Sequence, residues 1–94
     1  MKHLDRPGKS GRGKSIEFDR LPENLTEIVI ALSRDREYDG HSRKQYSNKE
    51  GCIDGVGPFW EFVGQGNKQR LVFDAGTGEM YATFDHHKSY SLVD

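Results

Sequence analysis

Two adjacent histidines near the C-terminal end are the residues of this chain best suited to chemistry. His86 and His87 lie in a polar run, DHHKSY at positions 85–90, which follows three short stretches of aromatic and β-branched residues. Because histidine titrates near neutral pH, either residue could act as a general acid or base. Neighbouring side chains on a strand point to opposite faces, so only a turn would bring both to one pocket. A solvent-exposed turn is the competing interpretation, and the sequence leaves both open.

A third histidine, His41, lies among aromatic and basic residues after the predicted helix. Its neighbours in the sequence are Tyr38, Arg43, Lys44 and Tyr46. Aromatic rings can stack on bases while cations neutralise phosphates, so such a cluster suits RNA. An ordinary solvated loop has the same composition. His41 therefore joins His86 and His87 as a candidate catalytic residue, without being favoured over them.

Basic residues supply the candidate contacts to substrate. Two of them, Lys68 and Arg70, lie beside a predicted hairpin turn. A cation there could stabilise the charge that develops on a phosphorane or keep a sheet edge soluble. Two more lie in the N-terminal segment. The full set of predicted substrate-binding residues is Lys88, Arg70, Lys68, Lys14 and Arg12. No close ligand spacing such as CxxC or HxxxH is present, so we predict no metal and no cofactor.

Positions 8–15, GKSGRGKS, fit the phosphate-loop pattern GxxxxGK[ST]. That motif works only where a strand delivers the loop and a helix follows it. Here DRP precedes the motif and IEFD follows it, so a nucleotide-hydrolysing loop is not expected. Residues 1–15 carry five basic residues against one acid and contain four glycine or proline breaks. We interpret them as a flexible basic arm, which suits phosphate contact or simple solvation.

The 94 residues provide for one core, and we expect a single domain over residues 16–94. With 33% hydrophobic and 31% charged residues the core should be thin, and ten aromatic side chains enlarge it. No apolar run is long enough to span a bilayer, and no signal peptide is recognisable, so we expect no membrane association. A lone cysteine, Cys52, excludes an internal disulfide framework and favours a reducing, cytoplasmic compartment.

The elements that must position these residues form an α+β pattern. A helix is predicted over residues 19–32 from an apolar stripe at i, i+3, i+4 and i+7, although residues 27–32 are also rich enough in β-branched side chains for a strand. Strands are predicted over residues 59–63, 70–74 and 80–84, with 16–18 and 90–93 as possible additions. Residues 33–49 are interpreted as a polar helix extension or loop. The expected fold is one or two helices packed on a three- to four-stranded antiparallel sheet.

This arrangement resembles the barnase–EndoU–colicin–RelE group of small ribonucleases, and within it colicin D-like toxin domains. In that group a turn with Thr-Gly precedes a late strand, followed by a short polar turn and a serine before an apolar end. The matching residues here are the Thr77-Gly78 turn within 70–80, the polar turn at 85–89 that ends on Ser89, and Leu92. An N-terminal Lys2-His3 pair is similar to the family's catalytic histidine region.

The resemblance implies metal-independent cleavage of RNA, with tRNA as one candidate substrate. A histidine would take the 2′-hydroxyl proton, a second group would protonate the leaving 5′-oxygen, and Lys88 or Arg70 would stabilise the phosphate. A toxin of this kind would need an immunity or antitoxin protein as partner. The alternative is a small non-catalytic binding or accessory protein, such as an immunity protein or a phage or plasmid adaptor, which explains the polar composition equally well.

Overall fold

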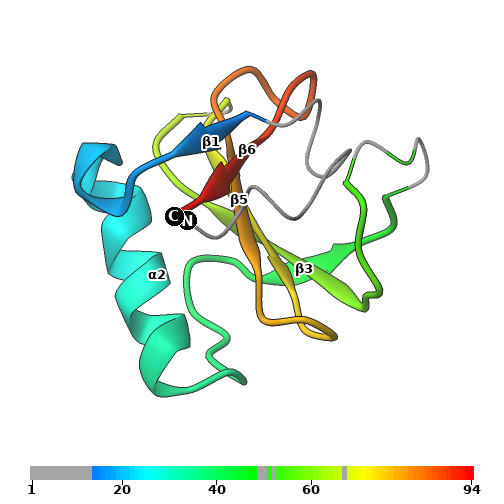
Figure 1. Cartoon of the computed structure of the whole chain (residues 1–94). Helices are drawn as coiled ribbons and strands as arrows, with labels where there is room; N and C mark the ends of the chain where they lie inside the picture. Colours follow the sequence, from blue (N-terminus) through cyan, green and yellow to red (C-terminus); the bar gives the residue numbers. More distant parts are fainter. Residues whose placement is uncertain (1–13, 49–50, 52, 67) are drawn as a thin grey trace.

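The computed structural model describes residues 14–48, 51, 53–66 and 68–94, in which one α-helix packs on a six-stranded sheet (Figure 1). The order of strands across the sheet is β1-β6-β5-β4-β3-β2. Neighbouring strands are antiparallel, except that β1 and β6 run parallel. The strands are β1 (Ser15–Ile16), β2 (Lys44–Tyr46), β3 (Phe59–Val63), β4 (Arg70–Asp74), β5 (Met80–Thr83) and β6 (Ser91–Val93).

The helix, α2 (Glu23–Arg34), begins directly after Pro22 and is preceded by a single 3-10 turn, η2 (Phe18–Arg20). Proline suits this position because its fixed φ angle fits the helix entry and its missing N–H would have no partner there. The predicted stripe is buried and consists of Leu25, Ile28, Val29 and Leu32. Burial of that stripe against the sheet confirms a helix, and not a strand, over residues 27–32.

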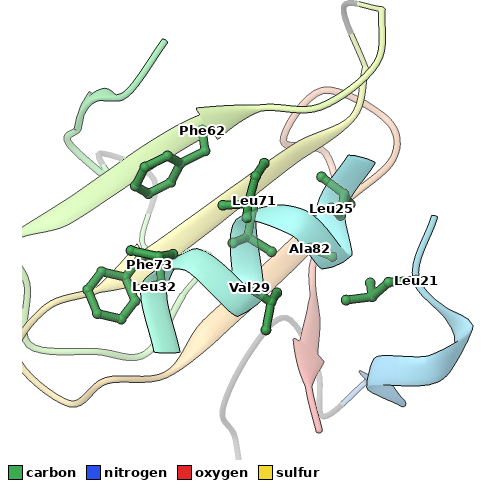
Figure 2. Close-up of a cluster of buried hydrophobic side chains, with 9 residues drawn as sticks. Leu21, Leu25, Val29, Leu32, Phe62, Leu71, Phe73 and Ala82 are labelled. Carbon is green, nitrogen blue, oxygen red and sulfur yellow. The ribbon is translucent and has the colours of Figure 1, made fainter. Parts of the chain in front are cut away.

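One face of the sheet is covered by α2. Phe62, Leu71, Phe73 and Ala82 point from the strands toward Leu25, Val29 and Leu32 of the helix (Figure 2). These side chains alternate along β3, β4 and β5 with residues that point to the other face. The three strands occupy the predicted positions to within one residue, because their aromatic and β-branched side chains fit a sheet that is buried on both sides.

The other face carries a second, more polar cluster. Its buried apolar members are Ile53, Phe59, Val72, Tyr81, Tyr90 and Leu92, and Tyr46 packs against them. Glu61 and Arg70 alternate onto the same face and are buried, with 6% and 9% of their surface exposed. A buried acid and a buried base among aromatic side chains direct attention to this face.

The expected fold class is wrong in its sheet: the described part of the chain forms six strands, and one pair is parallel. The strand without a predicted counterpart is β2, which is three residues long, whereas the two-residue β1 overlaps the possible strand at residues 16–18; these two strands lie at the two edges of the sheet. The sequence KQY of β2 has a single partly buried side chain, that of Tyr46, and two exposed polar ones, so it carries no strand signal of its own. Residues 44–46, expected in a polar helix extension or loop, thus form a strand through pairing with β3.

Residues 1–13, which make up most of the predicted basic arm, lie outside the described residues, as do Cys52 and most of the phosphate-loop pattern. Ser15, placed at the end of that arm, is paired with Leu92 in the sheet. Within the described part of the chain no helix is long and apolar enough to cross a bilayer.

Candidate active site

An ion pair between neighbouring strands forms the base of the candidate site. Nε of Arg70 donates to Oε2 of Glu61 over 2.9 Å, and only 10% and 8% of the two side chains are exposed. Arg70 also donates through Nη1 to the backbone oxygens of Gly66 and Gln69. The guanidinium is therefore fixed by three acceptors at the beginning of β4, with Glu61 held in the middle of β3.

His87 completes this cluster from the loop between β5 and β6. Its Nε2 lies 2.8 Å from the same Oε2 of Glu61, and 18% of its side chain is exposed. No hydrogen bond from a described residue reaches Oε1 of Glu61. Lys44 lies opposite Glu61 in the antiparallel pair of β2 and β3, so its exposed side chain is on the same face. A carboxylate, an imidazole and a guanidinium thus meet at one place, and Lys44 lies on the same face of the sheet.

The loop that carries His87 is held in an unusual backbone conformation. His86 and His87 have φ angles of 60° and 73°, the left-handed region that non-glycine residues seldom adopt. The hydroxyl oxygen of Thr83 accepts the backbone N–H of His87, while Asp85 accepts the backbone N–H groups of Lys88 and Ser89. These bonds hold the loop in the conformation that directs His87 to Glu61.

Asp85 is ionised over a wide range of pH because of these bonds. The hydroxyl of Ser89 donates to Oδ2 over 2.7 Å, and this bond is the main reason why the pKa of Asp85 falls from 3.8 to about 2. Partial burial opposes the shift, and the N–H groups of Ser89 and Lys88 and the hydroxyl of Thr83 add to it. The loop is thus tied together by a carboxylate that keeps its charge down to low pH.

Aromatic rings form the wall beside His87. The ring of Tyr46, from β2, stacks on the imidazole with a centroid distance of 4.8 Å and an interplanar angle of 11°. Tyr90, just before β6, is 1% exposed, and its hydroxyl lies 2.5 Å from Nδ1 of His87 and 2.6 Å from the hydroxyl of Tyr46. Both nitrogens of His87 therefore have partners.

The structure brings together two of the predicted site residues, His87 and Arg70. His86 is exposed beside them, with its ring centroid 5.3 Å from that of His87. Lys68 and Lys88 are exposed on the adjoining loops, which meet where the N–H of His86 donates to the carbonyl of Lys68. Lys14 precedes β1, where its carbonyl accepts the N–H of Leu92. Arg12 lies outside the described residues.

His41 is on the other side of the sheet. Its Nδ1 contacts the hydroxyl of Tyr38, whose ring stacks on Phe62 in the core beneath α2, and its Nε2 lies 3.8 Å from Glu27 of that helix. Arg43 also belongs to this side, since its guanidinium covers the ring of Trp60 at 4.2 Å. The basic–aromatic cluster of residues 38–46 is thus divided between the two faces.

Glu61, Tyr46 and Tyr90 were not among the predicted site residues. The available signal was the single acid in the strand FWEFV: alternation places Glu61 on the same face as Phe59, so its carboxylate points into a partly apolar environment. A buried carboxylate requires a partner. Among the described residues no group of three or more His, Cys, Asp or Glu side chains is arranged to hold a metal ion.

Comparison with known proteins identifies a class for this arrangement, that of the small ribonuclease fold. Crystal structures of ribonuclease Sa2 match the chain: the structure with exo-2′,3′-cyclophosphorothioate gives a TM-score of 0.72 at 20% identity, covering 86% of this chain and 96% of that one. Ribonuclease Sa2 with guanosine-2′-cyclophosphate covers the same shares and gives a TM-score of 0.70 at 22% identity. Neither a protein-family model nor a curated protein sequence matches the chain.

These matches establish the fold. The predicted resemblance to small ribonucleases is confirmed at that level, whereas the matched structures are of ribonuclease Sa2 and not of a colicin D-like toxin.

Proposed function

We propose that this protein is a small endoribonuclease that cleaves RNA without a metal ion. The observation that carries the proposal is the buried cluster of Glu61, Arg70 and His87, on a fold that ribonuclease Sa2 uses. A general base, a general acid and a fixed cation are the groups that phosphodiester cleavage by the neighbouring 2′-hydroxyl requires.

Glu61 acts as the base in this proposal. Its carboxylate removes the proton of the 2′-hydroxyl, and the 2′-oxygen then attacks the adjacent phosphorus. Oε1 is the oxygen that serves this purpose best, because both hydrogen bonds that Glu61 accepts from described residues end on Oε2. Arg70 is already fixed beside the carboxylate and stabilises the negative charge that spreads over the phosphorane oxygens.

His87 acts as the acid. In its protonated form it donates a proton to the 5′-oxygen as the bond from phosphorus to that oxygen breaks, which leaves a 2′,3′-cyclic phosphate and a free 5′-hydroxyl. The direct contact between His87 and Glu61 is replaced by the substrate phosphate, which then lies between them. In the second step His87 takes a proton from water, hydroxide attacks the cyclic ester, and Glu61 returns its proton to the 2′-oxygen.

The test is cleavage of total RNA and tRNA by the purified protein in EDTA, with detection of cyclic phosphate ends. Glu61→Gln and His87→Ala should each reduce the rate by roughly 10²–10⁴-fold. Glu27→Gln, which alters an exposed carboxylate on the helix, is the matched control and should cleave like the wild type. Intact RNA with folded wild-type protein would overturn the proposal and favour the non-catalytic binding protein.

His86→Ala separates the two neighbouring histidines. We expect it to keep most of the activity, because the imidazole of His87 is the one in contact with Glu61. The reverse result, with His86 needed and His87 dispensable, would transfer the acid role to His86 and leave the ribonuclease proposal intact. The toxin role and the immunity or antitoxin partner stay predictions.

A further inference from the structure

The two tyrosines beside His87 form a continuous chain of hydroxyl groups with it. The hydroxyl of Tyr90 lies between Nδ1 of His87 at 2.5 Å and the hydroxyl of Tyr46 at 2.6 Å. On the other side of the imidazole, Nε2 contacts Glu61. The chain therefore runs from Tyr46 through Tyr90 and His87 to Glu61, and on to Arg70.

Counting protons fixes the direction of each bond. An ionised carboxylate only accepts, so Nε2 of His87 carries a proton toward Glu61. In the neutral imidazole Nδ1 is then an acceptor, Tyr90 donates to it, and Tyr46 donates to Tyr90. In the imidazolium Nδ1 donates to Tyr90, which turns its own proton toward Tyr46. Both hydroxyl groups reverse direction, and every bond of the chain is kept in both protonation states.

We propose that Tyr90 and Tyr46 are positioning residues for His87, which hold its Nδ1 in a hydrogen bond in both protonation states and so leave Nε2 as the nitrogen that exchanges a proton. Burial of Tyr90 at 1% exposure protects its bond to His87 from competition by water. The nearly parallel ring of Tyr46 stacks on the imidazole and fixes its plane.

Other charged groups lie around His87, and their charges act on its neutral and on its protonated form. Glu61 approaches from β3, with Arg70 behind it on β4, and Lys44 lies on the same face of β2. His86, Lys88 and Asp85 belong to the loop of His87 itself. None of them contacts Nδ1 in the described structure, so removal of the Tyr90 hydroxyl acts on Nδ1 selectively.

Tyr90→Phe tests the proposal because it keeps the ring and removes the hydroxyl. The first measurement is the ¹⁵N NMR spectrum of the imidazole in the full chain, assigned with His87→Ala. Wild-type neutral His87 should be the Nε2–H tautomer with an accepting Nδ1, and Tyr90→Phe should shift the Nδ1 signal away from the hydrogen-bonded position. An unchanged Nδ1 signal would overturn the proposal.

The second measurement rests on the proposed function and is the effect of Tyr90→Phe on kcat and KM of RNA cleavage. Without the Tyr90 hydroxyl, Nδ1 of His87 loses its hydrogen-bond partner in both protonation states, so the imidazole is held less well in its reactive orientation. The value of kcat should fall by roughly tenfold, as for one hydrogen bond to a charged group, with KM little changed. A rise in KM with an unchanged kcat would show that Tyr90 only shapes the binding surface and would overturn the proposal.

Two further variants keep the outcome interpretable. Tyr46→Phe removes the outer hydroxyl from a half-buried residue and should shift the same signals by less, so it replaces Tyr90→Phe if that variant does not fold. Tyr38→Phe removes the hydroxyl that contacts His41 and should leave both His87 readouts unchanged. If the wild type cleaves no RNA, the proposed function fails, whereas the NMR measurement still decides the positioning of His87.

Discussion

The two faces of the sheet carry clusters of the same three residue types. In each cluster a histidine contacts a carboxylate through Nε2 and a tyrosine hydroxyl through Nδ1. On the helix face the cluster is Glu27–His41–Tyr38, and on the other face it is Glu61–His87–Tyr90. In both, a tyrosine hydroxyl three positions away in the chain lies 2.5 Å from Nδ1 of the histidine. In both, the histidine has a positive φ angle.

The carboxylates distinguish the two clusters. Nε2 of His41 is 3.8 Å from Glu27, whose side chain is 58% exposed, whereas Nε2 of His87 is 2.8 Å from Glu61, whose side chain is 8% exposed and also bound by Arg70. Charges that interact through water have little effect on each other, and charges removed from water depend on their partners. The two clusters therefore share their composition and differ in burial and in the fixed cation, and the proposed function of Glu61 and His87 rests on that difference.

The largest difference should appear when each carboxylate is removed. Glu61→Ala leaves the buried guanidinium of Arg70 without its partner, and we expect the free energy of unfolding to fall by about 3–5 kcal/mol. Glu27→Ala removes an exposed charge and should change it by no more than about 0.5 kcal/mol. Urea unfolding of both variants measures this. A double variant with Glu61 and Arg70 both replaced by methionine should recover most of the loss, since no buried charge is left unpaired.

Equal effects of Glu61→Ala and Glu27→Ala would mean that water reaches the Glu61–Arg70 pair, and the contrast between the two faces would then have no energetic basis.

A smaller effect should separate the loops that carry the two histidines. The loop of His87 is tied by Asp85, whose pKa is lowered to about 2, mainly by the Ser89 hydroxyl. A carboxyl with a pKa lower in the folded than in the unfolded chain stabilises the fold in its ionised form. This contribution is complete above the ordinary value of 3.8 and disappears as the pH falls toward about 2.

Asp85→Asn should therefore lower the free energy of unfolding by about 1 kcal/mol at neutral pH, a modest value because water screens this carboxylate. The difference from the wild type should shrink between pH 4 and pH 2 in thermal unfolding. Asp74 also has a lowered pKa: burial raises it, but bonds from the N–H groups of Val56, Gly57 and Gly76 bring it below its usual value. Because Asp74 is the same in both proteins, its contribution cancels in the difference. A difference independent of pH would assign the effect to the shape of the side chain.

The sequence predicts the centre of the sheet better than its edges. β3, β4 and β5 consist of aromatic and β-branched residues between glycine-containing turns, so their composition is sufficient. β2 is short and polar and is defined by its pairing with β3, which leaves no local signal. β1 is only two residues long, and the possible strand at residues 16–18 overlaps it at Ile16 alone. The parallel pair of β1 and β6 joins segments from opposite ends of the chain (Figure 1).

The site was predictable in part for a related reason. His87 and Arg70 are titratable or cationic residues at a sheet end, which is a local property. Glu61 is brought to Arg70 and His87 only by the register of β3 with β4 and the return of the loop after β5, which no local pattern contains. The cluster at residues 38–46 fails as a unit because β2 directs Tyr46 to His87, while Arg43 stacks on Trp60.

The smallest expected effect concerns His41. We choose His41→Asn because asparagine tolerates the φ angle of 53° at this position. The variant loses a long contact to an exposed carboxylate, so the free energy of unfolding should change by no more than about 0.5 kcal/mol. RNA cleavage should equal that of the wild type, since the sheet separates His41 from Glu61. A loss of cleavage above about tenfold in a protein of unchanged stability would contradict this. It would bring the helix face into the reaction, and the two clusters would then have to work together despite lying on opposite faces of the sheet.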